Sequence, residues 1–282
     1  MTEVSISKAL FGGKIDFVIY DAPKELVEGV VKEVYSEGLR LQKIFNFYDN
    51  TSELSILNKE RKKQVSNELL EVIKKALKFS EITDGTYDIS LGKSILLKKQ
   101  GKISESKCSY KDIKIRENEV HLTNPEVMID LGSIAKGYIT DKLAELMNEL
   151  GVEEFLIDAR GDICVKGKSN HILGIQNPRN EENLFFIKLK NQAVATSGDY
   201  NQYVGNYETS HIINQKELIS VTVIAKTTEE ADAYATAIFT ALPENRKKIT
   251  NSNKNIKVLI VDNGGDITLL NDFEELIHSE EK

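Results

Sequence analysis

The segment Ile129–Asp141 combines residue types that could bind a negatively charged group. Asp130 ends a short apolar run. Gly132 and Ser133 then lead into a predicted helix whose first turn carries Lys136. Backbone amides at a helix start attract anions, and the lysine would add a full positive charge. The pattern therefore suits a phosphate or a diphosphate. The alternative is structural: Ser133 would cap the helix and Lys136 would extend into solvent.

Asp232 and Thr236 form a second candidate site on another predicted helix. They are four residues apart, so their side-chain oxygens lie on the same helix face. Carboxylate and hydroxyl oxygens suit Mg²⁺, which often takes only one or two protein side chains as ligands. The pair therefore predicts a metal site. A structural explanation stays open, because an acidic residue near a helix start is favourable by itself and Thr227 with Glu230 resembles a capping box.

Two further side chains could contact a ligand. Tyr87 follows the turn at Asp84-Gly85, where an aromatic ring can either stack on a planar ligand or pack on the core. His211 is one of four histidines and lies in a polar stretch, where it could act as a base or be an ordinary surface residue. No GxSxG elbow or HExxH motif is present, so the sequence gives no support for a serine hydrolase or a zinc protease.

Hydrophobic periodicity predicts the elements that must position these residues. Helical patterns cover residues 24–45, 66–82, 133–150 and 228–242. Strand patterns cover 14–20, 154–158, 162–166, 171–176, 184–190, 192–196 and 219–225, with hairpins at 112–123 and around Asn263-Gly264. Hairpins dominate the second half of the chain. The strands and helices do not alternate regularly, and no linker segment divides the chain. The sequence therefore predicts one α+β domain over 1–282, with largely antiparallel sheets and packed helices.

The composition narrows the class of protein. The 282 residues include 37 basic and 44 acidic side chains, and this net charge of −7 argues against a nucleic-acid partner. The two cysteines, Cys108 and Cys164, have no CxxC spacing and predict neither a disulfide framework nor a zinc site. No run approaches about 18 apolar residues, so no membrane span is expected. No basic start followed by an apolar stretch is present either, so we expect a cytoplasmic location, with a trimmed periplasmic or membrane-anchored form as the alternative.

Six motifs occur in an order that resembles the ApbE family, the FAD:protein FMN transferases. They are NFYDNTSELSILN at 46–58, TDGTYD at 83–88, DLGSIAKGYITD at 130–141, TSGDY at 196–200, HII at 211–213 and SVTVIAKTTEEADAYATA at 220–237. The ordered set covers most of residues 11–240. Its specificity lies in the combination of motifs rather than in any single one.

The resemblance implies a fold and an activity. The family has an α+β fold with a T-fold-like core. Its members move FMN from FAD onto the Thr (or Ser) hydroxyl of an acceptor flavoprotein, with Mg²⁺ as cofactor, and release AMP. FAD is thus the expected substrate. The expected acceptor carries a segment similar to D-x-x-[ST]-G-A-T.

The resemblance also assigns residues to roles. Asp232, Thr236 and the backbone carbonyl of Ser133 would hold the metal. His211 is the candidate base, because an imidazole has a suitable pKa, and it joins Asp232 as an expected catalytic residue. FAD would contact Phe11, Tyr48, Thr86, Tyr87, Asp88, Asp130, Lys136 and Ile212.

This chain departs from the family pattern at two places. After His211–Ile213 it continues with Asn214 rather than D-P-x-T-G, and the family's G-G-D reads Arg160-Gly161-Asp162, so that Arg160 replaces a glycine. Two alternative functions stay open. One is a Mg²⁺-dependent FAD pyrophosphatase that makes FMN and AMP with the same residues. The other is a flavin-binding protein without catalysis, against which the intact Asp232 and Thr236 argue.

Overall fold

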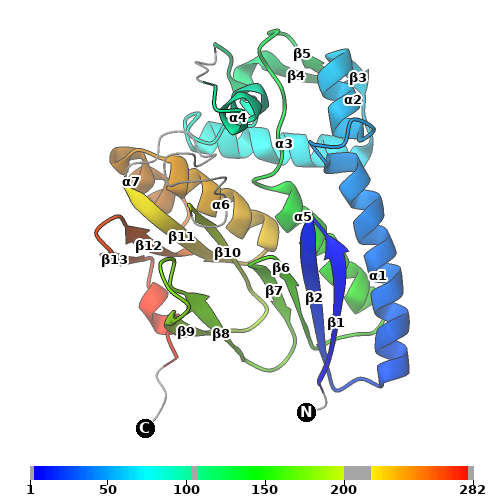
Figure 1. Ribbon diagram of the computed structural model, residues 1–282, viewed down its shortest axis with the longest axis vertical. Coiled ribbons are helices and arrows are strands. Elements are labelled where there is room, and N and C mark those ends of the chain that lie inside the picture. Colours follow the sequence, from blue (N-terminus) through cyan, green and yellow to red (C-terminus); the bar gives the residue numbers. More distant parts are fainter. Residues whose placement is uncertain (1–2, 103–106, 200–216, 279–282) are drawn as a thin grey trace.

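The computed structural model describes residues 3–102, 107–199 and 217–278 (Figure 1). Its centre is an eight-stranded sheet of order β1-β2-β6-β7-β10-β11-β12-β13, in which every neighbouring pair is antiparallel. The strands are β1 (Glu3–Leu10), β2 (Gly13–Tyr20), β6 (Phe155–Ala159), β7 (Asp162–Lys166), β10 (Ala193–Gly198), β11 (Leu218–Ala225), β12 (Lys257–Asp262) and β13 (Ile267–Leu270). The predicted α+β class with antiparallel sheets is confirmed.

Helices and two smaller sheets surround this centre. The helices are α1 (Lys24–Phe45), α2 (Glu53–Glu60), α3 (Asn67–Ile82), α4 (Gly92–Lys99), α5 (Ala135–Glu149), α6 (Thr228–Thr240) and α7 (Pro243–Ser252), with 3₁₀ turns η1 (Tyr110–Asp112) and η3 (Phe273–Leu276). The smaller sheets are β3 (Lys62–Gln64), β5 (Glu119–Leu122) and β4 (Ile113–Arg116), and the pair β8 (His171–Gln176) and β9 (Asn183–Leu189). Figure 1 shows α2, α3, α4 and the three-stranded sheet at the end of the molecule opposite both termini.

The large sheet is covered on both faces. Helices α1, α5 and α6 pack on one face, where α6 contacts β10 and β11 and α5 contacts β6 and β7. The hairpin β8–β9 and η3 close the other face with a second apolar cluster. Every residue of β11 is buried as a result, which explains why its sequence is a nearly continuous apolar run rather than an alternation.

Most predicted elements are present at nearly the predicted bounds. The helix predicted over 24–45 is α1 to the residue. Helices α3 and α6 differ by one or two residues at one end, and α5 does so at both ends. The sequence did not predict β1, α4 or α7. The apolar run before Asp130 forms only an isolated bridge between Leu91 and Met128. Within the part of the chain that the structure describes, no helix has the length and apolarity to span a bilayer.

Candidate active site

Helices α5 and α6 cross so closely that no side chain fits at the contact. A Cβ atom at Gly137 would lie 2.5 Å from the carbonyl oxygen of Thr228 and 2.7 Å from the amide nitrogen of Glu229. Both distances are shorter than any ordinary van der Waals contact, so the crossing requires glycine. The Gly137 amide also donates a hydrogen bond to Asp232 Oδ2 over 3.3 Å. Helix α5 therefore orients the carboxylate that was predicted to hold a metal.

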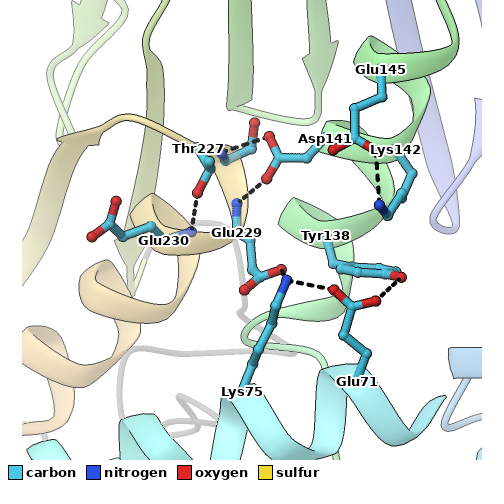
Figure 2. A network of polar contacts seen from close by, with 10 residues as sticks. Glu71, Lys75, Tyr138, Asp141, Lys142, Glu145, Thr227, Glu229 and Glu230 are labelled. Carbon is cyan, nitrogen blue, oxygen red and sulfur yellow. Dashed lines mark hydrogen bonds and ion pairs between the residues drawn. The ribbon is translucent and has the colours of Figure 1, made fainter. Parts of the chain in front are cut away.

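Asp141 on α5 caps the start of α6 (Figure 2). Its carboxylate accepts hydrogen bonds from the amides of Thr228 at 2.9 Å and Glu229 at 2.8 Å. The Thr227 hydroxyl accepts a third bond, from the amide of Glu230 at 3.2 Å, which confirms Thr227 as a cap. These bonds satisfy amides that a helix start otherwise leaves without partners, so α6 begins at a defined place beside α5.

A network of charged side chains ties α6 to α3 as well (Figure 2). Lys75 Nζ lies 2.9 Å from Glu71 Oε1 and 2.8 Å from Glu229 Oε2. The Tyr138 hydroxyl donates to Glu71 Oε2 over 3.1 Å. Burial raises the pKa of Glu229, and the Lys75 ammonium offsets part of that rise. Because three helices share this network, the position of α6 is fixed from two sides.

Three charged groups lie close together in the interior: Lys136 of α5, Asp162 at the start of β7 and Asp232 of α6. Lys136 Nζ lies 2.7 Å from Asp162 Oδ2, and the two aspartates are only 2% and 6% exposed. Burial and the nearby charge of Asp162 raise the pKa of Asp232 well above its ordinary value, although Lys136 opposes the rise. Burial also raises the pKa of Asp162. One ammonium facing two buried carboxylates leaves the cluster short of positive charge, so the site would stabilise an added cation.

The oxygen atoms around this cluster fit a hard cation. Asp232 and Thr236 lie one turn apart on α6, and the Thr236 hydroxyl is 3.1 Å from Ser197 Oγ at the end of β10. Asp162 Oδ2 makes its ion pair but no hydrogen bond of good geometry. Among the described residues, no three His, Cys, Asp or Glu side chains converge as a metal cage. An ion held mainly by one carboxylate, a hydroxyl and substrate oxygens is typical of Mg²⁺.

Tyr87 supports the turn that precedes α5. The Ser133 hydroxyl donates to Tyr87 Oη over 2.8 Å, and the tyrosine is only 2% exposed. Burial raises the pKa of Tyr87, so its hydroxyl stays protonated. The ring is buried in the core, and its contact with FAD stays a prediction. Nearby, Asp130 accepts a hydrogen bond from the Gly132 amide over 2.8 Å, and burial raises the pKa of Asp130.

The start of α5 differs from the sequence-based expectation. Ser133 does not cap the helix, which begins at Ala135 with Ile134 at the cap position. The amides of Ile134 and Ala135 donate to the Leu131 carbonyl over 3.1 and 2.8 Å, because a tight turn precedes the helix. The expected cradle of free amides is therefore wrong for these two groups. Lys136 supplies the positive charge, and its ion pair shows that it does not simply extend into solvent.

Thr86 and Asp88 lie in the loop between α3 and α4. Asp88 accepts hydrogen bonds from the amides of Ser90 at 2.8 Å and Tyr110 at 3.0 Å. The Thr86 hydroxyl accepts one from the Asn245 side chain at 3.3 Å. Burial raises the pKa of Asp88. Both side chains shape this loop, and their contact with FAD stays a prediction.

The two remaining residues that were predicted to contact FAD, and that the structure describes, are aromatic. Tyr48 is 60% exposed, its hydroxyl accepts a hydrogen bond from Lys99, and the lysine Nζ lies 4.4 Å from the ring centroid. Phe11 is half-buried at the tip of the β1–β2 hairpin. Its amide donates to Gln42 Oε1 over 2.6 Å, and its carbonyl accepts from Arg160 Nη1 over 2.7 Å. Both rings are accessible enough to contact a flat ligand.

The residues predicted for the site and those that the structure places there differ in two respects. His211 and Ile212 lie outside the described residues, so their roles as base and flavin contact stay predictions. Asp162 and Ser197 also lie at the site, although their sequence patterns did not predict a role there. Two signals for Asp162 were present in the sequence: it is the aspartate of the G-G-D pattern, and a buried strand begins at this acidic residue.

The fold and the site define an antiparallel α+β protein with a lysine and two buried carboxylates between two crossing helices. Residues 11–260 match the model of the ApbE family, and the chain belongs to that family. The FAD:protein FMN transferase of Buchnera aphidicola subsp. Baizongia pistaciae is 31% identical over 246 residues, which cover 78% of this chain and 72% of that protein. The enzyme of the same name from Escherichia coli K12 is 27% identical over 235 residues, covering 72% and 67%.

Solved structures are similar over almost the whole chain. The crystal structure of the ApbE protein from Thermotoga maritima aligns with a TM-score of 0.87 at 25% identity, covering 99% of this chain and 100% of that one. The flavin transferase ApbE from Vibrio cholerae aligns with a TM-score of 0.81 at 22% identity, covering 98% and 99%. The second similarity concerns the fold alone. The family resemblance inferred from the six ordered motifs is thereby confirmed.

Proposed function

We propose that this chain is an FAD:protein FMN transferase, which moves FMN from FAD onto a Thr or Ser hydroxyl of an acceptor flavoprotein and releases AMP. The observation that carries this proposal is the buried cluster of Lys136, Asp162 and Asp232 at the crossing of α5 and α6. The lysine and one aspartate come from two of the six ordered motifs. The names of the relatives support the same activity.

Mg²⁺ is the cofactor that the donor atoms suit best. Asp232, Thr236 and the backbone carbonyl of Ser133 would hold it, beside the buried Asp162 Oδ2 that lacks a good hydrogen bond. The shortage of positive charge in the cluster supports this fit. When bound, Mg²⁺ would neutralise negative charge on the diphosphate oxygens.

The reaction is a displacement at phosphorus. The acceptor hydroxyl oxygen forms a bond to the phosphorus of the FMN half while the bond from that phosphorus to the bridging oxygen breaks. AMP leaves with the bridging oxygen. In such transfers the protein contributes positioning and charge rather than covalent chemistry. The acceptor proton needs a base, and His211 is our candidate.

The residues around the cluster prepare this step. Asp162 holds the Lys136 ammonium in place, and the ion pair persists because the charges of Asp162 and Asp232 raise the lysine pKa although burial lowers it. The ammonium would then oppose charge that develops on phosphate oxygens during transfer. Tyr87 fixes the turn at Ser133 through the 2.8 Å hydrogen bond.

An acceptor-labelling experiment tests the proposal. The chain is incubated with FAD, Mg²⁺ and an acceptor that carries a D-x-x-[ST]-G-A-T-like segment, and flavin fluorescence is read on the acceptor after denaturing electrophoresis. The matched control is the same acceptor with its threonine replaced by alanine. We expect a fluorescent acceptor band only with the threonine. AMP release without any labelled acceptor would instead indicate an FAD pyrophosphatase, and neither product would indicate a flavin-binding protein without catalysis.

A further inference from the structure

Two hairpin tips meet beside the charged cluster, and each contains a non-glycine residue in the left-handed backbone region. The β1–β2 tip has Phe11 at φ +56° and Gly12 at φ +68°, and the β6–β7 tip has Arg160 at φ +61° and Gly161 at φ +91°. Phenylalanine and arginine adopt this conformation at a cost that only well-determined surroundings can sustain. Glycine would avoid this conformational cost at either position. The presence of phenylalanine and arginine there therefore indicates that their side chains have a role.

Arg160 and Gln42 hold Phe11 from both sides. Arg160 Nη1 donates to the Phe11 carbonyl over 2.7 Å, and the Phe11 amide donates to Gln42 Oε1 over 2.6 Å. The stem of the arginine passes over Gly13, where a Cβ atom would come within 2.7 Å of Arg160 Nε. Glycine at position 13 thus leaves the space that the arginine needs. This arrangement fixes both the Phe11 backbone and the place of the guanidinium.

The guanidinium brings a second permanent positive charge to the site. Arg160 lies two residues before Asp162. It is close enough to Lys136 that the repulsion between the two positive charges offsets part of the rise in the pKa of the lysine. The residue is exposed, and one of its five N–H donors forms the hydrogen bond to Phe11. The planar guanidinium is well suited to phosphate oxygens, to which it donates charge-assisted hydrogen bonds.

We propose that Arg160 is a specificity-determining residue, whose guanidinium binds the diphosphate of FAD while it also holds the backbone of Phe11. This inference rests on the proposed function, because it names the part of the substrate that this residue recognises. It concerns a residue at which this chain departs from the pattern of its family. Arg160 would thus discriminate between a flavin with a diphosphate and one without any phosphate.

Binding measurements on three variants test the proposal. FAD and riboflavin are titrated against the wild-type chain and against Arg160→Gln, Arg160→Lys and Arg160→Gly, with Mg²⁺ present and at two salt concentrations. We expect Arg160→Gln and Arg160→Gly to weaken FAD binding about tenfold, as expected for one charge-assisted hydrogen bond, and to reduce its salt dependence. Riboflavin affinity should fall by much less, because riboflavin has no phosphate for Arg160 to bind. Arg160→Lys should restore part of the FAD affinity, because it keeps the charge without the planar donors.

A matched control uses Arg116→Gln, which removes an exposed arginine from β4 in the small sheet and should leave both affinities unchanged. Arg160→Gly separates charge from backbone effects, because glycine relieves the positive φ and should not lower the melting temperature. Unchanged FAD affinity in both Arg160→Gln and Arg160→Gly would overturn the proposal. Equal weakening of FAD and riboflavin would also overturn it, because it would leave Arg160 with the positioning of Phe11 alone.

The proposal and the proposed function fail in different ways. If FAD binding depends on Arg160 but no acceptor becomes labelled, the transferase activity is refuted and the diphosphate contact stands. If the acceptor is labelled and the Arg160 variants bind FAD as tightly as the wild-type chain, the transferase activity stands and the diphosphate contact is refuted.

Discussion

Replacing Gly137 by alanine should push α6 away from α5 and displace the predicted metal ligands. The added Cβ atom would lie 2.5 Å from the Thr228 carbonyl oxygen, so the helices must separate by roughly 0.9 Å to restore a 3.4 Å contact. Such overpacking costs about 1–3 kcal/mol. Alanine recovers about 1 kcal/mol through its better helix propensity. The net loss in the free energy of unfolding should therefore be at most about 2 kcal/mol.

The same change should weaken metal binding, because Asp232 moves with α6 and loses its hydrogen bond from the Gly137 amide. Thermal unfolding should show a melting temperature lower by several degrees, roughly 2–4 °C for each kcal/mol. The Mg²⁺ concentration for half-maximal AMP release from FAD should rise. Gly29→Ala on α1 is the matched control, since no atom lies within 4 Å of its added Cβ and its exposed helix position should gain stability. A Gly137→Ala variant with wild-type stability and Mg²⁺ dependence would refute the role of this crossing.

Three other experiments test the metal site, the turn before α5 and the burial of the core. Asp232→Asn should remove most of the Mg²⁺-dependent activity and leave the circular dichroism spectrum unchanged, whereas Thr236→Val should lower the activity less. Near wild-type turnover of Asp232→Asn at saturating Mg²⁺ would exclude Asp232 as a metal ligand. Tyr87→Phe removes the hydrogen bond to Ser133 and should cost about 1 kcal/mol of stability by denaturant unfolding, and an unchanged midpoint would contradict its supporting role. Burial raises the pKa of Cys164 to about 12, so its thiol stays protonated at pH 8 and should resist alkylation in the native chain; modification detected there by peptide mass would contradict the buried position.

Local patterns predicted the elements that have a clear apolar face. Helix α1 follows Pro23 and buries one stripe of its surface, so its bounds could be predicted to the residue. Helix α4 was not predicted, because its apolar residues Ile95, Leu96 and Leu97 are consecutive and its cap position makes no side-chain bond. Strand β1 was missed because it is an edge strand, largely exposed and with polar residues on both sides.

Spacing also predicted which side chains share one element, but not which elements meet. Asp232 and Thr236 lie on the same face of α6 as expected from a separation of four residues. The partner of Lys136 could not be inferred this way, since Asp162 reaches it only through the sheet order that places β7 beside α5. The amides at the start of α5 donate to the Leu131 carbonyl because a tight turn precedes the helix, and residue spacing does not predict the geometry of that turn.

The ratio of AMP released to FMN attached tests the transferase activity most directly. The chain is given FAD labelled in both halves, Mg²⁺ and a threonine-bearing acceptor, and AMP and protein-bound FMN are counted in the same reaction. Transfer predicts a ratio close to one, with both products absent when the acceptor threonine is alanine. AMP in large excess over bound FMN, released at the same rate with and without the acceptor, would contradict the proposed function.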